Sequence, residues 1–274
     1  MARLALIGLT GRSLFFNVPR FHAGGETIHA AGFHEEWGGK GFNQAVAAAR
    51  QSAEVSFLTA VGAGDVAQVR DFLASEKIAG TVFGKETPSA HAAILTDGSG
   101  ETRVTVFPGA RLDVADVEPF AESIASSDFL LLNNEVPEEV NLRASEIASA
   151  AGVRIILNPA PARTLPAALA AHVFLFTPNE FEETALGDVP SEVVTTLGAK
   201  GCRIRSTGEV VLAPSAKAVD STGAGDTFNG VLAVRLAEGA SLRDACVAAN
   251  AAAARSVAVR YVLPSIPHRS SCEK

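Results

Sequence analysis

The chain has 274 residues, 47% of them hydrophobic and 19% charged, which is enough apolar material for a large core and too little charge for a disordered chain. Its formal net charge of −7, without a run of Lys and Arg, excludes a surface built for nucleic acid or anionic membrane, because neutralising phosphates needs clustered positive charge. We therefore expect a globular protein that acts on a small molecule.

The cysteines and histidines indicate a protein of a reducing compartment, and their spacing indicates no zinc site. Cys202, Cys246 and Cys272 are scattered, without Cys-x-x-Cys spacing, and no two of the six histidines have the spacing of helical metal ligands. The apolar run in the first residues is short, and none elsewhere reaches the length of a membrane span. These features predict a cytoplasmic protein with no membrane contact.

Short apolar runs, typical of strands buried on both faces of a parallel sheet, alternate with helical patterns along the chain. Strands are expected at residues 2–8, 55–62, 129–133, 153–158, 173–177 and 193–197, and helices at 41–51, 66–76, 138–151 and 241–256. This alternation predicts an α/β protein, a three-layer α/β/α sandwich around a mainly parallel sheet, as one domain over residues 1–274.

Two stretches interrupt the alternation, about residues 14–36 and about residues 80–107. The second has the pattern of two strands around a turn at Asp97-Gly98. Ligands of open parallel sheets bind beyond the carboxyl ends of the strands, so a flap inserted after the early strands can cover them. We predict a small β lid from these two stretches.

The first polar motif is Gly-Gly-Lys-Gly-Phe-Asn-Gln at residues 38–44, directly before a helical run. Its glycines allow a ligand to approach the backbone closely, and Lys40 and Asn43 could hold polar groups of that ligand. A glycine-rich turn with solvated polar residues is the other interpretation of this segment.

The second motif is Asp-Ser-Thr-Gly-Ala-Gly-Asp-Thr-Phe-Asn-Gly at residues 220–230, where small residues lead into a helix. A helix N-terminus with free amides suits phosphate oxygens. Asp226 in the first turn could cap the helix or accept a proton from an attacking hydroxyl, and the local pattern leaves both roles open. No Gly-Lys-Ser/Thr follows the glycines, so this is not a Walker A loop.

Together the two motifs resemble the paired signatures of the ribokinase-like carbohydrate kinases. Further segments resemble that family in the same order, at residues 25–27, 158–162, 177–180, 196–201 and 264–267, so the resemblance covers nearly the whole chain. It implies the ribokinase-like fold, transfer of the γ-phosphoryl of ATP to a hydroxyl of a small sugar-like substrate, and a homodimer formed through the lids.

The resemblance also implies a role for each matching residue. Asp226 would be the catalytic base, and the amides of Gly223, Ala224 and Gly225 would form an anion hole. The implied substrate contacts are Gly11, Ser13, Gly39, Lys40, Asn43 and Glu135. The implied nucleotide and Mg²⁺ region comprises Asn179, Glu182, Thr196, Gly198, Gly201 and Asn250. A monovalent cation such as K⁺ would lie near Asp220, Thr222 and Ser265.

The sequence departs from the family pattern at several positions. Ser13 stands where the family has an aspartate that binds two sugar hydroxyls, and Tyr261 stands in a loop that usually holds a glycine. The span between Asn179 and Thr196 is too short for the usual helix there. These departures leave open a nucleoside or pseudouridine kinase, or a catalytically silent sugar- or nucleotide-binding regulator. Arg12, beside Ser13, would suit an acidic substrate.

Overall fold

The computed structural model describes residues 1–272, and its largest element is a nine-stranded sheet in the order β13-β12-β11-β10-β9-β8-β1-β4-β5. The strands are β1 (Arg3–Ile7), β4 (Glu54–Gly62), β5 (Ile78–Lys85), β8 (Phe129–Asn133), β9 (Arg154–Asn158), β10 (Leu175–Phe176), β11 (Glu192–Thr196), β12 (Cys202–Ile204) and β13 (Val210–Val211). All pairs from β5 to β11 are parallel, and only the edge strands β12 and β13 pair antiparallel. The mainly parallel sheet expected from the sequence is confirmed.

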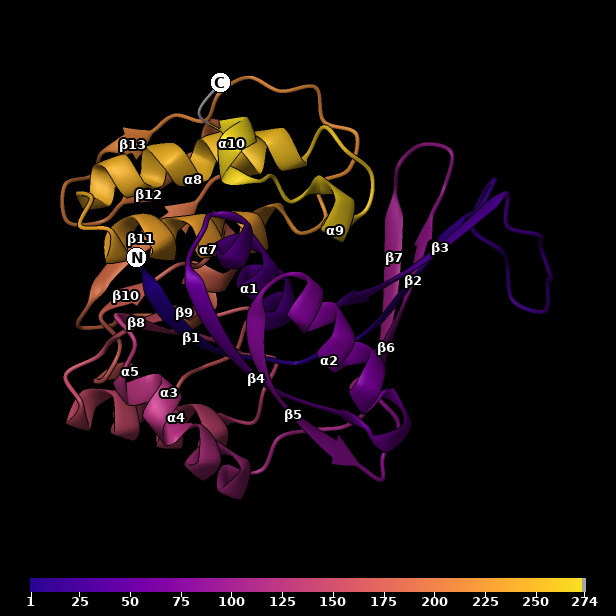
Figure 1. Cartoon of the computed structure of the whole chain (residues 1–274). Coiled ribbons are helices and arrows are strands. Elements are labelled where there is room, and N and C mark those ends of the chain that lie inside the picture. The colour runs from indigo at the N-terminus through magenta and orange to yellow at the C-terminus, as the bar shows by residue number, and fades with distance from the viewer. Residues whose placement is uncertain (273–274) are drawn as a thin grey trace.

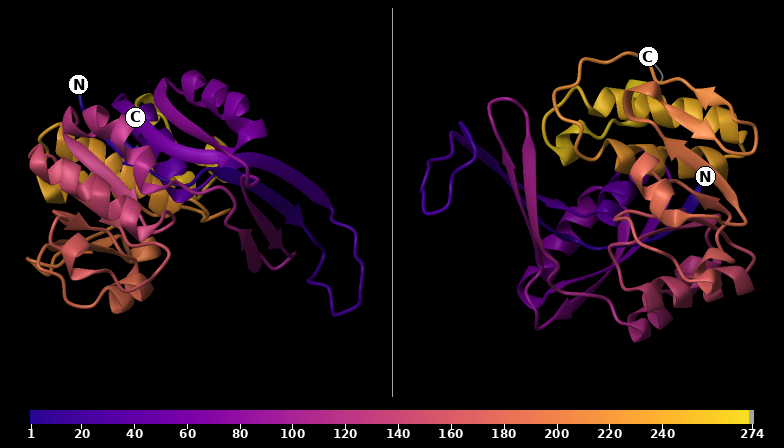
Figure 2. Two further views of the ribbon diagram at one scale, coloured as in Figure 1. Left: turned by 90° about the horizontal axis from the view of Figure 1, so that it is seen from below. Right: turned by 180° about the vertical axis from the view of Figure 1, so that it is seen from behind.

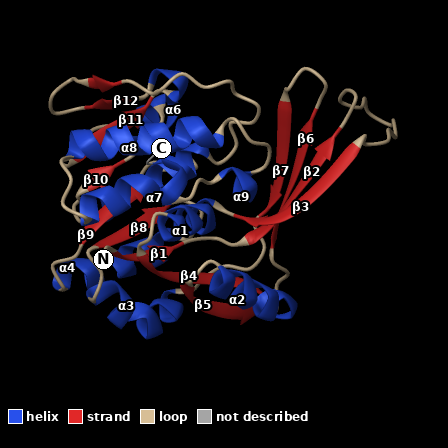
Figure 3. Cartoon of the chain, turned by 45° about the horizontal axis from the view of Figure 1, so that its top comes forward, coloured by secondary structure: helices blue, strands red, loops and turns tan. Residues whose placement is uncertain are grey.

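Helices cover both faces of this sheet (Figure 3). One layer contains α1 (Lys40–Arg50), α2 (Val66–Ser75), α7 (Ala224–Ala237) and α8 (Leu242–Ser256). The opposite layer contains α3 (Ala121–Ala125), α4 (Glu138–Ala150) and α5 (Ala167–Ala170), preceded by the 3-10 helix η2 (Val114–Phe120). The three-layer α/β/α sandwich is thereby confirmed. Within residues 1–272, no helix has both the length and the apolarity needed to cross a bilayer.

The central strand β1 shows why its apolar run is unbroken. Leu4 and Leu6 pack into the core with α1 and α7, whereas Ala5 and Ile7 pack into the core with α4. All four are buried, because successive side chains of a strand point to opposite faces and both faces are covered. The same reason explains the fully buried run of β8.

A second, four-stranded sheet projects from one side of the body, as Figures 1 and 2 show. It has the order β3-β2-β6-β7 and consists of β2 (Gly11–Asn17), β3 (Gly32–Gly38), β6 (Ala90–Thr96) and β7 (Thr102–Phe107). We call it the lid sheet. Its strands differ from the two ranges expected for a lid, since residues 80–85 belong to β5, which pairs with β4 in the large sheet.

Three of the remaining short helices follow strands of the large sheet, and the last two follow α8. In chain order, these short helices are η1 (Ala63–Asp65), α6 (Glu180–Leu186), η3 (Gly198–Lys200), α9 (Val262–Ser265) and α10 (Arg269–Cys272). The short span between Asn179 and Thr196 therefore retains a helix, α6, of only 7 residues.

Two close backbone contacts fix α1 against the sheet and against α7. A Cβ on Gly41 would lie 2.6 Å from the Cα of Gly8, so α1 begins directly at the carboxyl end of β1. A Cβ on Gly230 of α7 would lie 2.6 Å from the Cβ of Ala47 and 2.7 Å from the carbonyl oxygen of Gln44. These glycines allow α1 and α7 to approach more closely than larger residues would permit.

We predict that Gly230→Ala lowers the free energy of unfolding. Overpacking costs about 1–3 kcal/mol, and here the clash includes backbone that cannot rotate away, so the cost should exceed the roughly 1 kcal/mol that alanine gains over glycine in a helix. Urea unfolding measures the change. Gly64→Ala is the matched control, since a Cβ there meets no atom within 4 Å, and equal stability of the two variants would contradict the prediction.

Candidate active site

The N-terminus of α1 carries the first group of predicted site residues to the carboxyl edge of the sheet. Its N-cap, Gly39, has φ 120°, and a Cβ there would lie 2.2 Å from the carbonyl oxygen of Leu9. Glycine is therefore required at this position. The first turns of α1 then hold Lys40, Asn43 and Gln44 beside the ends of β1 and β8.

Asp226 is the third residue of α7, and its side chain points at α1 and not at solvent. Its Oδ2 accepts a hydrogen bond from Asn43 Nδ2 at 2.8 Å, and its Oδ1 accepts one from Gln44 Nε2 at 3.3 Å. The residue is only 7% exposed. The Oδ1 atom of Asn43 is buried and has no hydrogen-bond partner.

Lys40 and Glu135 complete a charged group around Asp226. Glu135, which follows β8, accepts a hydrogen bond from the backbone amide of Lys40 at 2.6 Å, and its own amide donates to Asn133 Oδ1 at 3.0 Å. The sequence separates Glu135 from Lys40 by 95 positions, and the adjacency of β1 and β8 in the sheet brings them together.

The electrostatics of this group are shaped by burial. Burial raises the pKa of Asp226, against the opposing effects of Lys40 and the Asn43 and Gln44 amides. Burial also raises the pKa of Glu135 to about 7, with Lys40 opposing the shift and Asp226 adding to it. Burial alone would lower the pKa of Lys40, but Asp226, Glu135 and Glu182 raise it. A carboxylate with its pKa raised toward neutrality beside a cation is typical of proton-transfer sites.

The glycines before Asp226 form the start of α7. Gly223 is the N-cap, with φ 75°, and a Cβ there would lie 2.4 Å from a methyl carbon of Val262. A Cβ on Gly225 would meet nothing within 4 Å, so the backbone beside it is open. The Ala224 amide donates a long hydrogen bond to the carbonyl oxygen of Ser221 at 3.3 Å. An open helix N-terminus of this kind suits an anion.

Asn179 and Glu182 form a capping box at the start of α6. The Glu182 amide donates to Asn179 Oδ1 at 2.8 Å, and the Asn179 amide donates to Glu182 Oε2 at 2.9 Å. Glu182 also lies within electrostatic reach of Asp226 and Lys40. Thr196 is bridged to Asn179, while Gly198 and Gly201 frame η3 immediately after. Glu182 thus links the start of α6 to the Asp226 group, and Thr196 is joined to this segment through Asn179.

Asn250 is turned away from this group. Its Nδ2 donates to the carbonyl oxygen of Val211 at 2.9 Å and contacts Cys202 Sγ at 3.5 Å, so the side chain ties α8 to β13 and β12. It is also buried. These contacts hold α8 against the edge of the sheet.

The residues that the resemblance matches to a cation loop connect the segment before α7 with the segment before α9. Asp220 accepts hydrogen bonds from the amides of Thr222 at 2.9 Å and Tyr261 at 3.0 Å, and Ser265 donates to the carbonyl oxygen of Val262. Tyr261 adopts φ 66°, a left-handed conformation that favours glycine, and its ring stacks on His34 at 3.8 Å. The backbone shape of a glycine is thus retained by a tyrosine. Among residues 1–272, no three His, Cys, Asp or Glu side chains converge as metal ligands.

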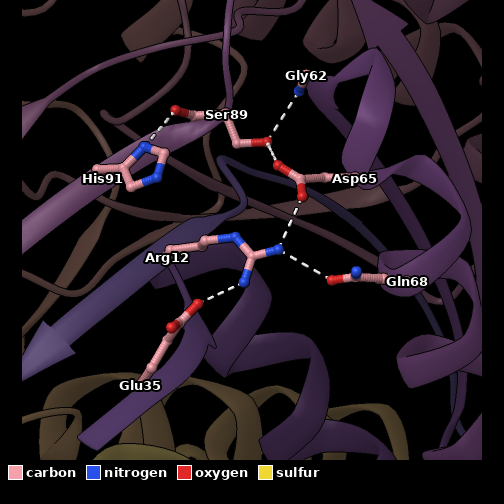
Figure 4. A network of polar contacts seen from close by, with 7 residues as sticks. All are labelled: Arg12, Glu35, Gly62, Asp65, Gln68, Ser89 and His91. Carbon is pink, nitrogen blue, oxygen red and sulfur yellow. Dashed lines mark hydrogen bonds and ion pairs between the residues drawn. The ribbon is translucent and has the colours of Figure 1, made fainter. Parts of the chain in front are cut away.

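Arg12 lies where the lid sheet meets the start of α2, on the opposite face of β2 from Ser13. Figure 4 shows its guanidinium between Glu35, Asp65 and Gln68, with distances of 2.8 Å to Asp65 and 2.9 Å to Gln68. The Ser89 hydroxyl donates a hydrogen bond to Asp65 and accepts one from the Gly62 amide. Two carboxylates already neutralise Arg12, so it is not placed to select an acidic substrate.

Four polar residues of the site were not predicted from the sequence, namely Gln44, Asn158, Thr177 and Asn229. They are buried and hydrogen-bonded in series beside Asp226. Signals for them are present in the sequence, because Gln44 and Asn229 lie within the two motifs at residues 38–44 and 220–230. Asn158 and Thr177 end apolar strand runs, where polar side chains at a parallel sheet's carboxyl edge are expected.

The comparisons with known proteins agree with this fold. Residues 1–269 match the family model described as pfkB family carbohydrate kinase. The chain is 33% identical to ribokinase of Bacillus subtilis, over 100% of this chain and 99% of that protein. Among solved structures, ribokinase of Thermotoga maritima is similar with a TM-score of 0.88 and 29% identity, covering 100% and 98% of the two chains. Arabidopsis thaliana ribokinase complexed with ribose and ATP has a TM-score of 0.85 and 25% identity, with coverage of 100% and 98%.

The chain belongs to the pfkB family of carbohydrate kinases. It is therefore an enzyme of the phosphotransferase class with an alcohol group as acceptor, and the family expected from the two motifs is confirmed.

We predict that Glu135 makes the protein less stable as pH rises. Its folded-state pKa of about 7 lies above the ordinary value of 4.5, so between these values the folded state binds more protons than the unfolded state and the free energy of unfolding falls with rising pH. Glu135→Gln should flatten this slope in urea unfolding measured from pH 4.5 to 7.5, leaving the part due to Asp226. The control is Glu139→Gln, an exposed glutamate of α4. An unchanged slope in Glu135→Gln would contradict the assignment.

Proposed function

We propose that this protein transfers the γ-phosphoryl group of ATP to a hydroxyl of a small sugar or sugar-like substrate, with Asp226 as the general base. The observation that carries the proposal is the buried Asp226 carboxylate at the start of α7, oriented by Asn43 and Gln44 and adjacent to glycine backbone at the helix N-terminus. A catalytically silent regulator is less well supported, because the carboxylate, Lys40 and the α7 glycines are all present together.

In the proposed phosphoryl transfer, each group of site residues has its own role. Asp226 takes the proton of the substrate hydroxyl, whose oxygen forms a bond to the γ-phosphorus as the bond to the ADP oxygen breaks. The amides of Gly223, Ala224 and Gly225, with the positive end of α7, stabilise the charge on the transferred group. Asn43 Oδ1 accepts from a substrate hydroxyl, and Lys40 and Glu135 hold the substrate near it.

The nucleotide would lie along the segments that follow β10 and β11. Asn179 and Glu182 fit a magnesium and phosphate region, because both carry oxygen atoms, the ligands Mg²⁺ prefers, and Glu182 interacts electrostatically with Asp226. Mg²⁺ would neutralise phosphate charge during transfer. Thr196, Gly198 and Gly201 would border the nucleotide, Asn250 would support that wall from α8, and K⁺ would lie by Asp220, Thr222 and Ser265.

The lid sheet would contribute Gly11 and Ser13 to the substrate site and would also join two copies of the chain. Apolar side chains that are at least half exposed on this sheet support such a dimer, namely Phe33, Val104, Val106 and Phe107. A cytoplasmic location is part of the same proposal, since the buried Cys202 and Cys246 are free thiols.

Asp226→Asn tests the proposed base. We expect kcat to fall roughly 10²- to 10⁴-fold, because the amide cannot accept the hydroxyl proton, with only a small change in ATP and substrate affinity. ADP production with sugars, sugar acids and nucleosides as acceptors measures this. Asp244→Asn is the matched control, since Asp244 is likewise the third residue of a helix, α8, but lies on the surface. Equal activity of Asp226→Asn and wild type would remove Asp226 from the mechanism.

Ser13→Asp tests which hydroxyls the lid recognises. A carboxylate can accept hydrogen bonds from two neighbouring hydroxyls, and each such bond contributes about 1.5–3 kcal/mol. We therefore expect kcat/KM for ribose to rise at least about 10-fold in this variant. Ser13→Asn, which lacks the charge, is the control. No gain with ribose would reject Ser13 as the specificity position, and a wild-type preference for a nucleoside would favour a nucleoside kinase.

A further inference from the structure

A buried series of hydrogen bonds leads away from the proposed base and returns to its own helix. Gln44 Nε2 lies 3.3 Å from Asp226 Oδ1 and 3.4 Å from Asn158 Oδ1. Asn158 Nδ2 donates to the carbonyl oxygen of Thr177 at 2.7 Å, and the Thr177 hydroxyl donates to Asn229 Oδ1. Asn229 Nδ2 then donates to the carbonyl oxygen of Gly225 at 2.8 Å.

This series joins four separate parts of the chain. Gln44 lies on α1, Asn158 ends β9, Thr177 follows β10, and Asn229 lies one turn beyond Asp226 on α7. The residues Gln44, Asn158, Thr177 and Asn229 are each at most 7% exposed, whereas the final acceptor, the carbonyl oxygen of Gly225, belongs to an exposed residue at the start of α7. Breaking a hydrogen bond between buried groups leaves a polar atom without its partner and away from water, which is costly.

We propose that Gln44 is a positioning residue for the phosphoryl-transfer reaction, holding the Asp226 carboxylate in a fixed orientation relative to the amides at the start of α7. The proposal rests on the assignment of Asp226 as the base. Gln44 differs from its neighbour Asn43, whose buried Oδ1 has no hydrogen-bond partner. Gln44 is 1% exposed, and its amide nitrogen contacts only protein groups, Asp226 and Asn158.

Two carboxylate oxygens need two restraints to fix the plane of the group. Asn43 holds Oδ2 and Gln44 holds Oδ1, both from the same turn of α1. With Gln44 removed, the carboxylate can rotate about its remaining bond, and a misplaced base transfers protons poorly even when substrate binds normally. The loss should therefore appear in kcat and not in KM.

The pH dependence gives a readout that a purely structural role would not change. The hydrogen bond from Gln44 lowers the pKa of Asp226, and its loss should move the acid limb of the kcat profile to higher pH. The other charged groups facing Asp226 are Lys40, Glu135 and Glu182, and the variants below leave them unchanged.

The experiment compares Gln44→Met, Gln44→Glu and Gln51→Met with wild type. For Gln44→Met we expect kcat to fall roughly 10- to 100-fold, KM to change less than about 2-fold, and the acid limb to move upward in pH. For Gln44→Glu the second carboxylate disfavours ionisation of Asp226, so activity should be lost at low pH and regained at high pH. Gln51→Met, at the C-cap of the same helix and equally buried, should match the wild-type profile.

Two results would overturn the proposal. One is a Gln44→Met enzyme with wild-type kcat and pH profile, and the other is a loss of activity that Gln51→Met reproduces with no change of profile. If Gln44→Met does not fold, Asn158→Ala removes the anchor of the Gln44 amide and should give a smaller shift in the same direction.

A titration of the Asp226 carboxyl carbon by ¹³C NMR separates this proposal from the proposed function. The signal is assigned by its absence in Asp226→Asn, and its midpoint should rise in Gln44→Glu and Gln44→Met. Turnover by Asp226→Asn would reject Asp226 as the base without affecting this measurement. An unchanged midpoint in both Gln44 variants would reject Gln44 as the group that holds Asp226.

Discussion

The burial of one carboxylate at the start of α7 determines how the rest of the site is built. Asp226 is removed from water by α1, and an ionised group in that position needs hydrogen bonds and a nearby cation. Asn43 and Gln44 supply the bonds, and Lys40 supplies the charge. Because all three lie in the first turns of α1, the contact between α1 and α7 at Gly230 becomes a condition for the chemistry and not only for stability.

The lid sheet is attached to the body on both of its faces. On one face, Arg12 connects β2 and β3 to the start of α2 through Glu35, Asp65 and Gln68. On the other face, Glu36 accepts hydrogen bonds from the amides of Val262 and Leu263 at the start of α9, and His34 stacks on Tyr261. The lid is thereby coupled to the loop that also packs against Gly223.

Tyr261 illustrates how a departure from a family pattern can leave the local backbone unchanged. A left-handed φ costs a bulky residue free energy that glycine avoids. Here the aromatic contacts with His34 and Phe15 stabilise that conformation, together with the hydrogen bond that the Tyr261 amide donates to the Asp220 carboxylate. The loop shape follows from tertiary contacts that only the folded lid provides.

The sequence by itself determined the layers, most element positions and the two motifs, because buried parallel strands, amphipathic helices and glycine-rich helix starts are local patterns. It also led to Asp226, Lys40, Asn43 and Glu135, which the sheet order brings together. Only the tertiary structure decided that β5 belongs to the large sheet and that Arg12 pairs with Asp65 beside the lid sheet. It also decided that Asn250 supports β13 and that Gln44 and Asn158 lie behind Asp226. These depend on which separate segments become neighbours, and a contact between residues far apart in the chain leaves no local pattern in a single sequence.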